Sequence, residues 1–126
     1  MLIIFYDSLT GMVKNFSKRL GFEMKDVRDL DLNNIPDEMI LITRSWDFGK
    51  IPDSTLDFLD DLADFNKLSN LKGVAVSGNK NWGQNFGKAG DTIQKEYGVP
   101  LVIKFEGSGF KKDVDFVKEY IQKVLK

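Results

Sequence analysis

Four short apolar runs, each rich in β-branched residues, restrict the folds open to this chain more than any other feature. They cover residues 2–6, 39–43, 73–77 and 101–105. Strands that are buried on both faces of a parallel sheet have this composition. We therefore expect four central strands, and we expect the more polar residues 23–30 to form a strand at one edge.

Helical patterns separate these runs. The first has apolar residues at positions 13, 16 and 20 and stops at Gly21. Similar patterns follow Pro52, where Asp53 or Ser54 is expected to cap the helix, and recur within residues 86–97 and 114–125. Alternating strands and helices predict a doubly wound α/β fold: a three-layer sandwich with a five-stranded parallel sheet of order 2-1-3-4-5 and helices on both faces.

Composition limits the chemistry. The 126 residues, 42% of them hydrophobic, suit a single domain spanning 1–126, and 18 basic against 19 acidic residues give no field that would attract nucleic acid or an anionic membrane. The absence of cysteine and histidine excludes thiol chemistry and the usual neutral-pH general base. No apolar stretch approaches bilayer length, so we expect a soluble, cytoplasmic protein without a metal site.

A polar loop interrupts the first strand–helix unit, in the sequence FYDSLTGMV at residues 5–13. In a sheet of order 2-1-3-4-5 this loop lies where the strand order reverses, which is where such sheets bind ligands. Ser8 and Thr10 offer hydroxyl groups, Gly11 allows close backbone approach, and the helix start presents unpaired N–H groups. The loop is best interpreted as an anion site. The alternative is that a hydroxyl caps the helix and Gly11 only permits a tight turn.

Two more loops are expected at the same edge: TRSWDFGKIP at residues 43–52 and SGNKNWGQNFG at residues 77–87. Each carries a Trp and glycines. A planar ligand ring needs an aromatic partner and nearby backbone groups, and Trp82 is the first choice for stacking. Trp46 and Phe48 are weaker candidates. Together, the three loops suit a flat, phosphorylated ligand.

These segments resemble the NrdI family, the flavodoxin-like partners of class Ib ribonucleotide reductase. The similarity runs through YDSLTGMV (6–13), FGKIP (48–52), GVAVSGNKNWGQNFG (73–87), YGVP (97–100) and FEGSGFKKDV (105–114), and so covers nearly the whole chain. The resemblance implies a flavodoxin-like fold with bound FMN. It also implies that the flavin, reduced by an electron donor, reacts with dioxygen and delivers superoxide to the radical-forming small subunit, whose dimanganese centre is thereby oxidised.

The resemblance also implies which residues contact FMN. The phosphate would be held by Ser8, Leu9, Thr10, Gly11, Met12 and Val13. The N5 edge of the ring would be contacted by Ser45, Trp46, Asp47, Phe48 and Gly49, and the pyrimidine side by Ser77, Gly78, Asn79, Trp82 and Gly83. The protein would then be a redox accessory whose chemistry takes place on the flavin, rather than a stand-alone metabolic enzyme.

One residue departs from the family pattern. Relatives often have glycine before the Phe-Gly of the second loop, where a peptide flips on flavin reduction, and this chain has Asp47. Asp adopts left-handed conformations less freely than Gly, and its charge disfavours an anionic reduced flavin. We therefore expect the reduced flavin to be less stabilised here. Arg44 and Lys50 either offset this charge or face a partner, and the sequence leaves both open.

Three other readings compete. A receiver domain shares the layout, but its phosphoacceptor site holds Thr43 and Arg44 instead of aspartate. A general flavodoxin-type electron carrier is the main rival, although such carriers tend to be strongly acidic whereas this chain has a net charge of -1. A cofactor-free interaction module would be colourless.

Overall fold

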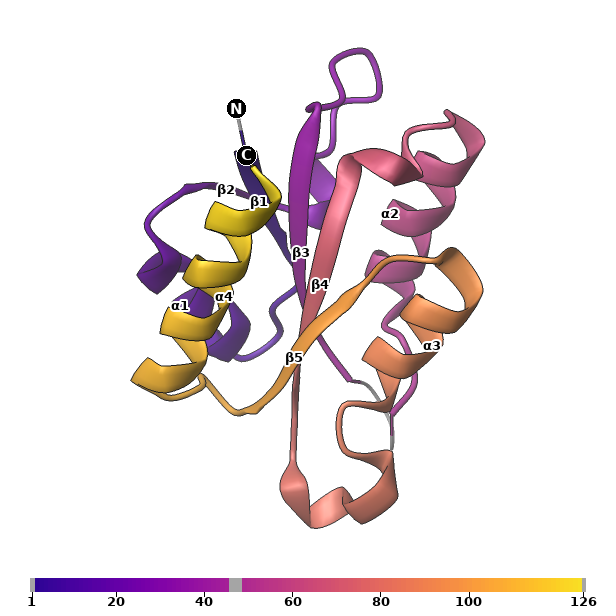
Figure 1. The fold of residues 1–126 in the computed structure, drawn as a ribbon. Coiled ribbons are helices and arrows are strands. Elements are labelled where there is room, and N and C mark those ends of the chain that lie inside the picture. The colour runs from indigo at the N-terminus through magenta and orange to yellow at the C-terminus, as the bar shows by residue number, and fades with distance from the viewer. Residues whose placement is uncertain (1, 46–48, 126) are drawn as a thin grey trace.

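The computed structural model describes residues 2–45 and 49–125 of the chain. They form three layers (Figure 1), with a sheet between two pairs of helices. One face of the sheet is covered by α1 (Met12–Leu20) and α4 (Lys111–Val124), and the other by α2 (Asp53–Asp64) and α3 (Lys88–Tyr97). Each of these four α-helices therefore packs against one face of the sheet, as the alternating pattern of strands and helices predicted.

The sheet has five strands: β1 (Leu2–Tyr6), β2 (Glu23–Asp26), β3 (Glu38–Arg44), β4 (Leu71–Gly78) and β5 (Leu101–Glu106). Their order is β2-β1-β3-β4-β5, and all neighbouring pairs are parallel. The predicted fold class and strand order are confirmed. Because the order reverses between β1 and β3, the loops after these strands diverge and leave room for a ligand at the carboxyl edge.

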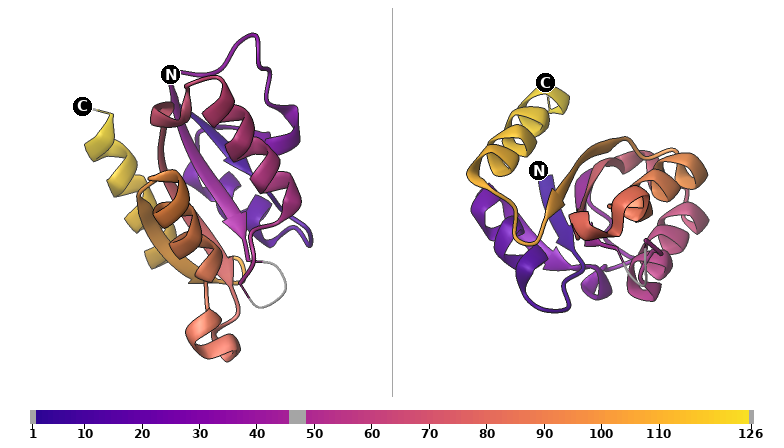
Figure 2. Two further views of the ribbon diagram at one scale, coloured as in Figure 1. Left: turned by 90° about the vertical axis from the view of Figure 1, so that its right-hand side faces the viewer. Right: turned by 90° about the horizontal axis from the view of Figure 1, so that it is seen from below.

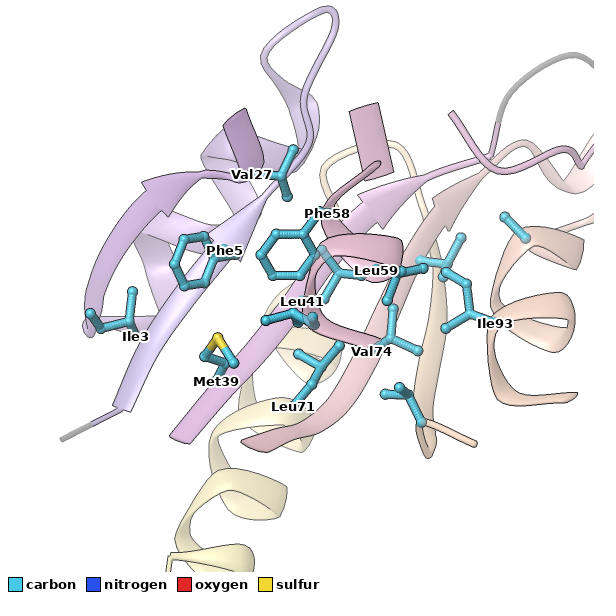
Figure 3. Close-up of a cluster of buried hydrophobic side chains, with 14 residues drawn as sticks. Ile3, Phe5, Val27, Met39, Leu41, Phe58, Leu59, Leu71, Val74 and Ile93 are labelled. Carbon is cyan, nitrogen blue, oxygen red and sulfur yellow. The ribbon is translucent and has the colours of Figure 1, made fainter. Parts of the chain in front are cut away.

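A hydrophobic core lies between the sheet and the α2–α3 layer (Figure 3), where Phe5 of β1 packs on Phe58 of α2 with ring centroids 5.1 Å apart. On the other face, Phe16 of α1 stacks on Phe105 of β5 at 3.9 Å. Gly109 packs against this second core, and a larger residue would not fit there because a Cβ would come within 2.7 Å of the Phe16 ring. The two cores fix both helix pairs against a central sheet whose strands β3 and β4 are almost wholly buried.

The predicted edge strand ends early. Residues 23–30 were expected to be extended, but β2 stops at Asp26 and a 3-10 helix follows at Val27–Asp29. The carboxylate of Asp26 accepts the backbone N–H of Arg28 at 2.9 Å and also binds the Arg28 guanidinium. This side-chain-to-backbone bond competes with the strand and turns the chain.

Two helix starts also differ from the prediction. Pro52, rather than Asp53 or Ser54, occupies the N-cap position of α2, and the Ser54 hydroxyl donates instead to the carboxylate of Asp7. Helix α3 begins only at Lys88, so Phe86, which was assigned to its apolar face, precedes it and donates its N–H to Gly83 at 2.9 Å. In both places a group that was expected at the helix start makes its hydrogen bond outside the helix.

The carboxyl ends of the strands share one edge, from which residues 80–85 project as a 3-10 segment (Figures 1 and 2). This edge carries the three loops that the sequence singled out. Within the described parts of the chain, no helix has the length and apolar character needed to cross a bilayer.

Candidate functional site

The first loop is organised by Ser8. Its hydroxyl oxygen accepts the backbone N–H groups of Gly11 at 3.1 Å and Lys14 at 3.2 Å. Gly11 adopts φ +92°, a left-handed conformation that favours glycine, and its carbonyl accepts the N–H of Asn15 at 2.9 Å as α1 begins. The alternative role weighed for this loop, a helix cap on a tight glycine turn, is therefore present in the structure.

Capping by Ser8 does not use up the anion-binding capacity of this helix start. The Ser8 hydroxyl accepts a hydrogen bond from the backbone N–H of Lys14. Met12 and Val13 occupy the first turn of α1, where backbone N–H groups have no partner inside the helix. The helix dipole adds partial positive charge at the same point. Leu9 is 65% exposed beside it. The loop is thus a preformed turn with amides at an open helix end.

The second loop begins at Ser45, directly after β3. Its backbone N–H donates to the Ser77 carbonyl at 3.0 Å, which joins the second loop to the third. The Ser45 side chain is only 8% exposed, and its hydroxyl has no hydrogen-bond partner among the described residues. Trp46, Asp47 and Phe48 lie outside those residues. Gly49 has φ +108°, and a Cβ there would lie 2.7 Å from the Lys88 side chain, so it is fitted against α3.

The third loop is tied to the turn after β5. The Ser77 hydroxyl donates to the Gly107 carbonyl at 2.6 Å, and the Gly107 N–H reaches the Gly78 carbonyl at 3.4 Å. Farther along, Glu106 accepts the backbone N–H of Lys80 at 3.0 Å. These contacts hold the segment that carries Trp82 against the end of β5.

Trp82 sits in a short 3-10 turn. Its N–H donates to the Asn79 carbonyl at 3.0 Å, and the Asn79 side chain accepts the N–H of Asn81 at 2.9 Å. The Trp82 side chain is half-buried. Gly83 follows with φ +56°, and a Cβ there would meet open space. The hydrogen bonds within this turn therefore fix the backbone from which the Trp82 indole extends.

The three loops enclose a pocket of about 560 Å³, a volume in the range of small-molecule and cofactor sites. Ten of the sixteen residues assigned from the sequence line it: Ser8, Leu9, Thr10, Met12, Val13, Ser45, Ser77, Gly78, Asn79 and Trp82. Gly11, Gly49 and Gly83 belong to the loops but are not among the described lining residues. The rest of the lining consists of Arg44, Asn81, Glu106 and Gly107.

Two of these four residues carried a signal in the sequence. Asn81 lies inside the SGNKNWG segment, and Arg44 directly precedes Ser45 and was left with two open roles. Glu106 and Gly107 belong to FEGSG, a segment that supported the resemblance but received no site role. Their place at the pocket depends on the pairing of β5 with β4, where Glu106 lies opposite Gly78.

A buried polar cluster lies beneath the pocket. The Asp7 carboxylate, on a residue 4% exposed, accepts the Thr55 hydroxyl at 2.7 Å and that of Ser54. Thr55 also shares a 2.8 Å hydrogen bond with Thr43, and Arg44 Nε lies 3.5 Å from Asp7 Oδ1. This cluster joins the ends of β1 and β3 to the first turn of α2, and so sets the spacing of the first two loops.

Comparison with known proteins identifies the family. The model of the family described as "NrdI Flavodoxin like" matches residues 4–119. The chain belongs to the NrdI flavodoxin-like family. One NrdI relative, the SPbeta prophage-derived protein NrdI of Bacillus subtilis strain 168, is 41% identical over 124 residues, which cover 96% of this chain and 92% of that protein. The resemblance inferred from the sequence motifs is confirmed.

Solved structures support the fold of this NrdI-family chain. A short-chain flavodoxin associated with a PDU bacterial microcompartment matches with a TM-score of 0.77 at 19% identity, covering 96% of this chain and 93% of the other. The flavodoxin of Fusobacterium nucleatum, determined bound to flavin mononucleotide, matches with a TM-score of 0.63 at 16% identity, covering 98% and 95%. At these identities, the likeness establishes the fold alone.

The lining of the pocket fits a phosphorylated flavin in chemistry as well as size. The buried Ser45 hydroxyl faces a pocket in which a ligand can supply the hydrogen bond that the described residues do not. The start of α1 offers amide donors for an anion, and Trp82 offers an aromatic face. The donor set therefore matches a ligand with a flat ring at one end and an anion at the other.

Proposed function

We propose that this protein binds FMN in the pocket formed by its three loops and serves class Ib ribonucleotide reductase. The proposal rests on one observation above all: an amide-rich helix start, a buried hydroxyl without a described partner and a Trp border the same pocket at the switch point of the sheet. Membership of the NrdI flavodoxin-like family supports it, as does the FMN-bound flavodoxin of the same fold.

Each loop has a separate task. Ser8 to Val13 hold the phosphate through backbone amides and the Thr10 hydroxyl. The Ser8 hydroxyl stabilises this turn by accepting the N–H groups of Gly11 and Lys14. Ser45 to Gly49 contact the N5 edge of the ring. Ser77 to Gly83 contact its pyrimidine side, where Trp82 stacks and the Asn-rich turn offers hydrogen bonds.

When bound, FMN supplies the electron transfer to dioxygen, for which this chain has no cysteine or histidine of its own. The protein would hold the ring between the second and third loops, and superoxide formed at the flavin would pass to the small subunit of the reductase, where it would oxidise a dimanganese centre. A separate electron donor reduces the flavin. The chain acts as a redox accessory of that subunit, as one domain spanning 1–126 and in the cytoplasm.

The test uses protein loaded with FMN and reduced without oxygen. It is mixed with manganese-loaded small subunit and exposed to dioxygen, and the tyrosyl radical is measured by electron paramagnetic resonance. We expect radical in amounts that follow the FMN-loaded protein, and much less with an equal amount of free reduced FMN. Radical formation that does not depend on the protein would contradict the proposal.

A general electron carrier is the second candidate, favoured by the structural similarity to flavodoxins. The same experiment separates the two. A carrier would exchange electrons with a flavodoxin reductase but yield no radical in the manganese-loaded subunit.

A further inference from the structure

Arg44 gives the pocket its cationic charge. It is the only Lys or Arg among the described residues that line the pocket, and Glu106 is the only acidic one. Its side chain is 20% exposed, so the guanidinium is largely withdrawn from solvent. A charge in such a place interacts with a ligand more strongly than the surface lysines do, because water screens it less.

One partner of Arg44, the Asp7 carboxylate, is more buried than Arg44 itself, since the two side chains are 5% and 20% exposed. Asp7 is not among the described lining residues, while Arg44 Nε, 3.5 Å from Asp7 Oδ1, belongs to a side chain that does line the pocket. The hydroxyl of Thr55 donates to the same carboxylate. A ligand in the pocket therefore meets the positive member of the pair first, and the negative member is hydrogen-bonded from below.

The sheet places Arg44 at the carboxyl end of β3, directly before the second loop. Arg44 pairs with Ser77 on β4, and it lies two residues beyond Ile42, which pairs with Tyr6 on β1. The register with β1 ends at that pair, and the backbone N–H of Asp7 donates to the Ile42 carbonyl at 2.9 Å. Arg44 thus lies at the carboxyl edge of the sheet, between the strands that lead into the first and third loops.

We propose that Arg44 recognises the phosphate and makes the pocket selective for FMN over riboflavin. This inference rests on the proposed function. A phosphate monoester carries a charge of about −1.5 to −2 at neutral pH, and backbone amides offer only partial charges in return. The net charge of the whole chain is only -1, so the overall charge does not attract a phosphate. The guanidinium adds a charged donor to the amide cradle, and the neighbouring Asp7 carboxylate offsets part of its charge.

Binding of two flavins to the apoprotein tests this. FMN and riboflavin share the ring and differ in the phosphate, so their dissociation constants, measured from quenching of flavin fluorescence, isolate the phosphate contribution. Arg44→Gln should weaken FMN binding by about tenfold or more and change riboflavin binding by less than about twofold. Arg44→Lys keeps the charge without the planar fork and should restore part of the loss.

Two controls separate recognition from stability. Arg28→Gln removes the same charge from an arginine that also pairs with an aspartate, Asp26, but is not among the described residues that line the pocket, and it should leave both dissociation constants unchanged. Arg44→Gln leaves the Asp7 carboxylate buried without its cation, which can weaken the fold. The double variant Asp7→Asn/Arg44→Gln removes both charges, and its FMN-to-riboflavin selectivity should still be lost.

The outcomes distinguish this inference from the proposed function. Suppose that the native protein binds FMN well. If Arg44→Gln then weakens the binding of FMN and riboflavin equally, or weakens neither, the inference is overturned and the proposed function stands. The same holds if only the reduction potential of bound FMN changes, because Arg44 would then act on the ring. If the native protein binds neither flavin, both the proposed function and this inference are contradicted.

Discussion

The hydroxyl oxygen of Ser8 accepts the backbone N–H of Lys14 at 3.2 Å, across the first turn of α1. It accepts the N–H of Gly11 as well, so one side chain closes the turn and caps the helix. Ser8→Ala should therefore lower the free energy of unfolding of the apoprotein by about 1 kcal/mol. Chemical denaturation measures this, with the exposed Ser69→Ala as a matched control. Equal stability of the two variants would show that the cap contributes nothing.

Trp82 is expected to stack on the ligand ring. Trp82→Ala should weaken FMN binding by about 1 kcal/mol, or about fivefold, and reduce the quenching of flavin fluorescence, because an aromatic face is lost. Trp82→Phe keeps an aromatic ring in the same turn and should retain most of the FMN affinity and most of the fluorescence quenching. Titration with FMN measures the two variants side by side. If alanine and phenylalanine behave alike, Trp82 does not stack.

Much of the fold could be predicted because its determinants are local. Runs of buried β-branched residues and helical spacing gave five strands, four helices and the strand order. The predictions were wrong where a side chain makes a hydrogen bond to a partner that the sequence pattern did not indicate. Ser54 was expected to cap α2, but its hydroxyl donates to Asp7, which lies 47 residues away. Asp26 ends the edge strand because its carboxylate accepts the N–H of Arg28.

The site shows the same division. Ser8, Thr10, Ser77 and Trp82 were found because polar loops after apolar strands mark the carboxyl edge of a parallel sheet. Gly107 was missed because its contact is long-range: the Ser77 hydroxyl reaches its carbonyl across 30 residues. Arg44 was noticed but not placed, because its position at the pocket follows from the pairing of β3 with β1 and β4, which brings residues far apart in the sequence together.

Asp47 lies outside the described residues, and its role stays a prediction from the sequence. Replacing it with glycine removes a negative charge expected near the ring and frees the peptide to flip, so both one-electron potentials of bound FMN should rise. A tenfold gain in stabilisation of a reduced state corresponds to about 60 mV. Spectroscopic redox titration measures both steps, with Asp47→Asn as a control that removes charge alone. No change in either potential would refute the idea.

Tyr97 on α3 donates its hydroxyl to Asp60 on α2 at 2.6 Å. Burial, together with this hydrogen bond, raises the pKa of Tyr97 to about 12 from an ordinary 10.0. Between these values the unfolded chain loses a proton that the folded protein keeps. The stabilisation is therefore complete below pH 10 and lost as the pH rises toward 12.

Tyr97→Phe should accordingly lose stability less steeply across that alkaline window than the native protein. Denaturation curves at several pH values give the two slopes, and the difference between them isolates the contribution of Tyr97 from that of every group the two proteins share. Tyr120, whose pKa burial also raises, leaves a residual slope in both proteins. Parallel slopes would mean that Tyr97 titrates alike in the folded and unfolded chains.

Binding of FMN itself is the most direct test of the account, because every assigned role depends on that ligand in that pocket. Purified apoprotein is titrated with FMN while flavin fluorescence and visible absorption are recorded. We expect quenching that saturates at one FMN per chain, with a dissociation constant of about 1 μM or lower, and a yellow protein after gel filtration. Flavin that stays fully fluorescent and elutes separately from the protein would contradict it.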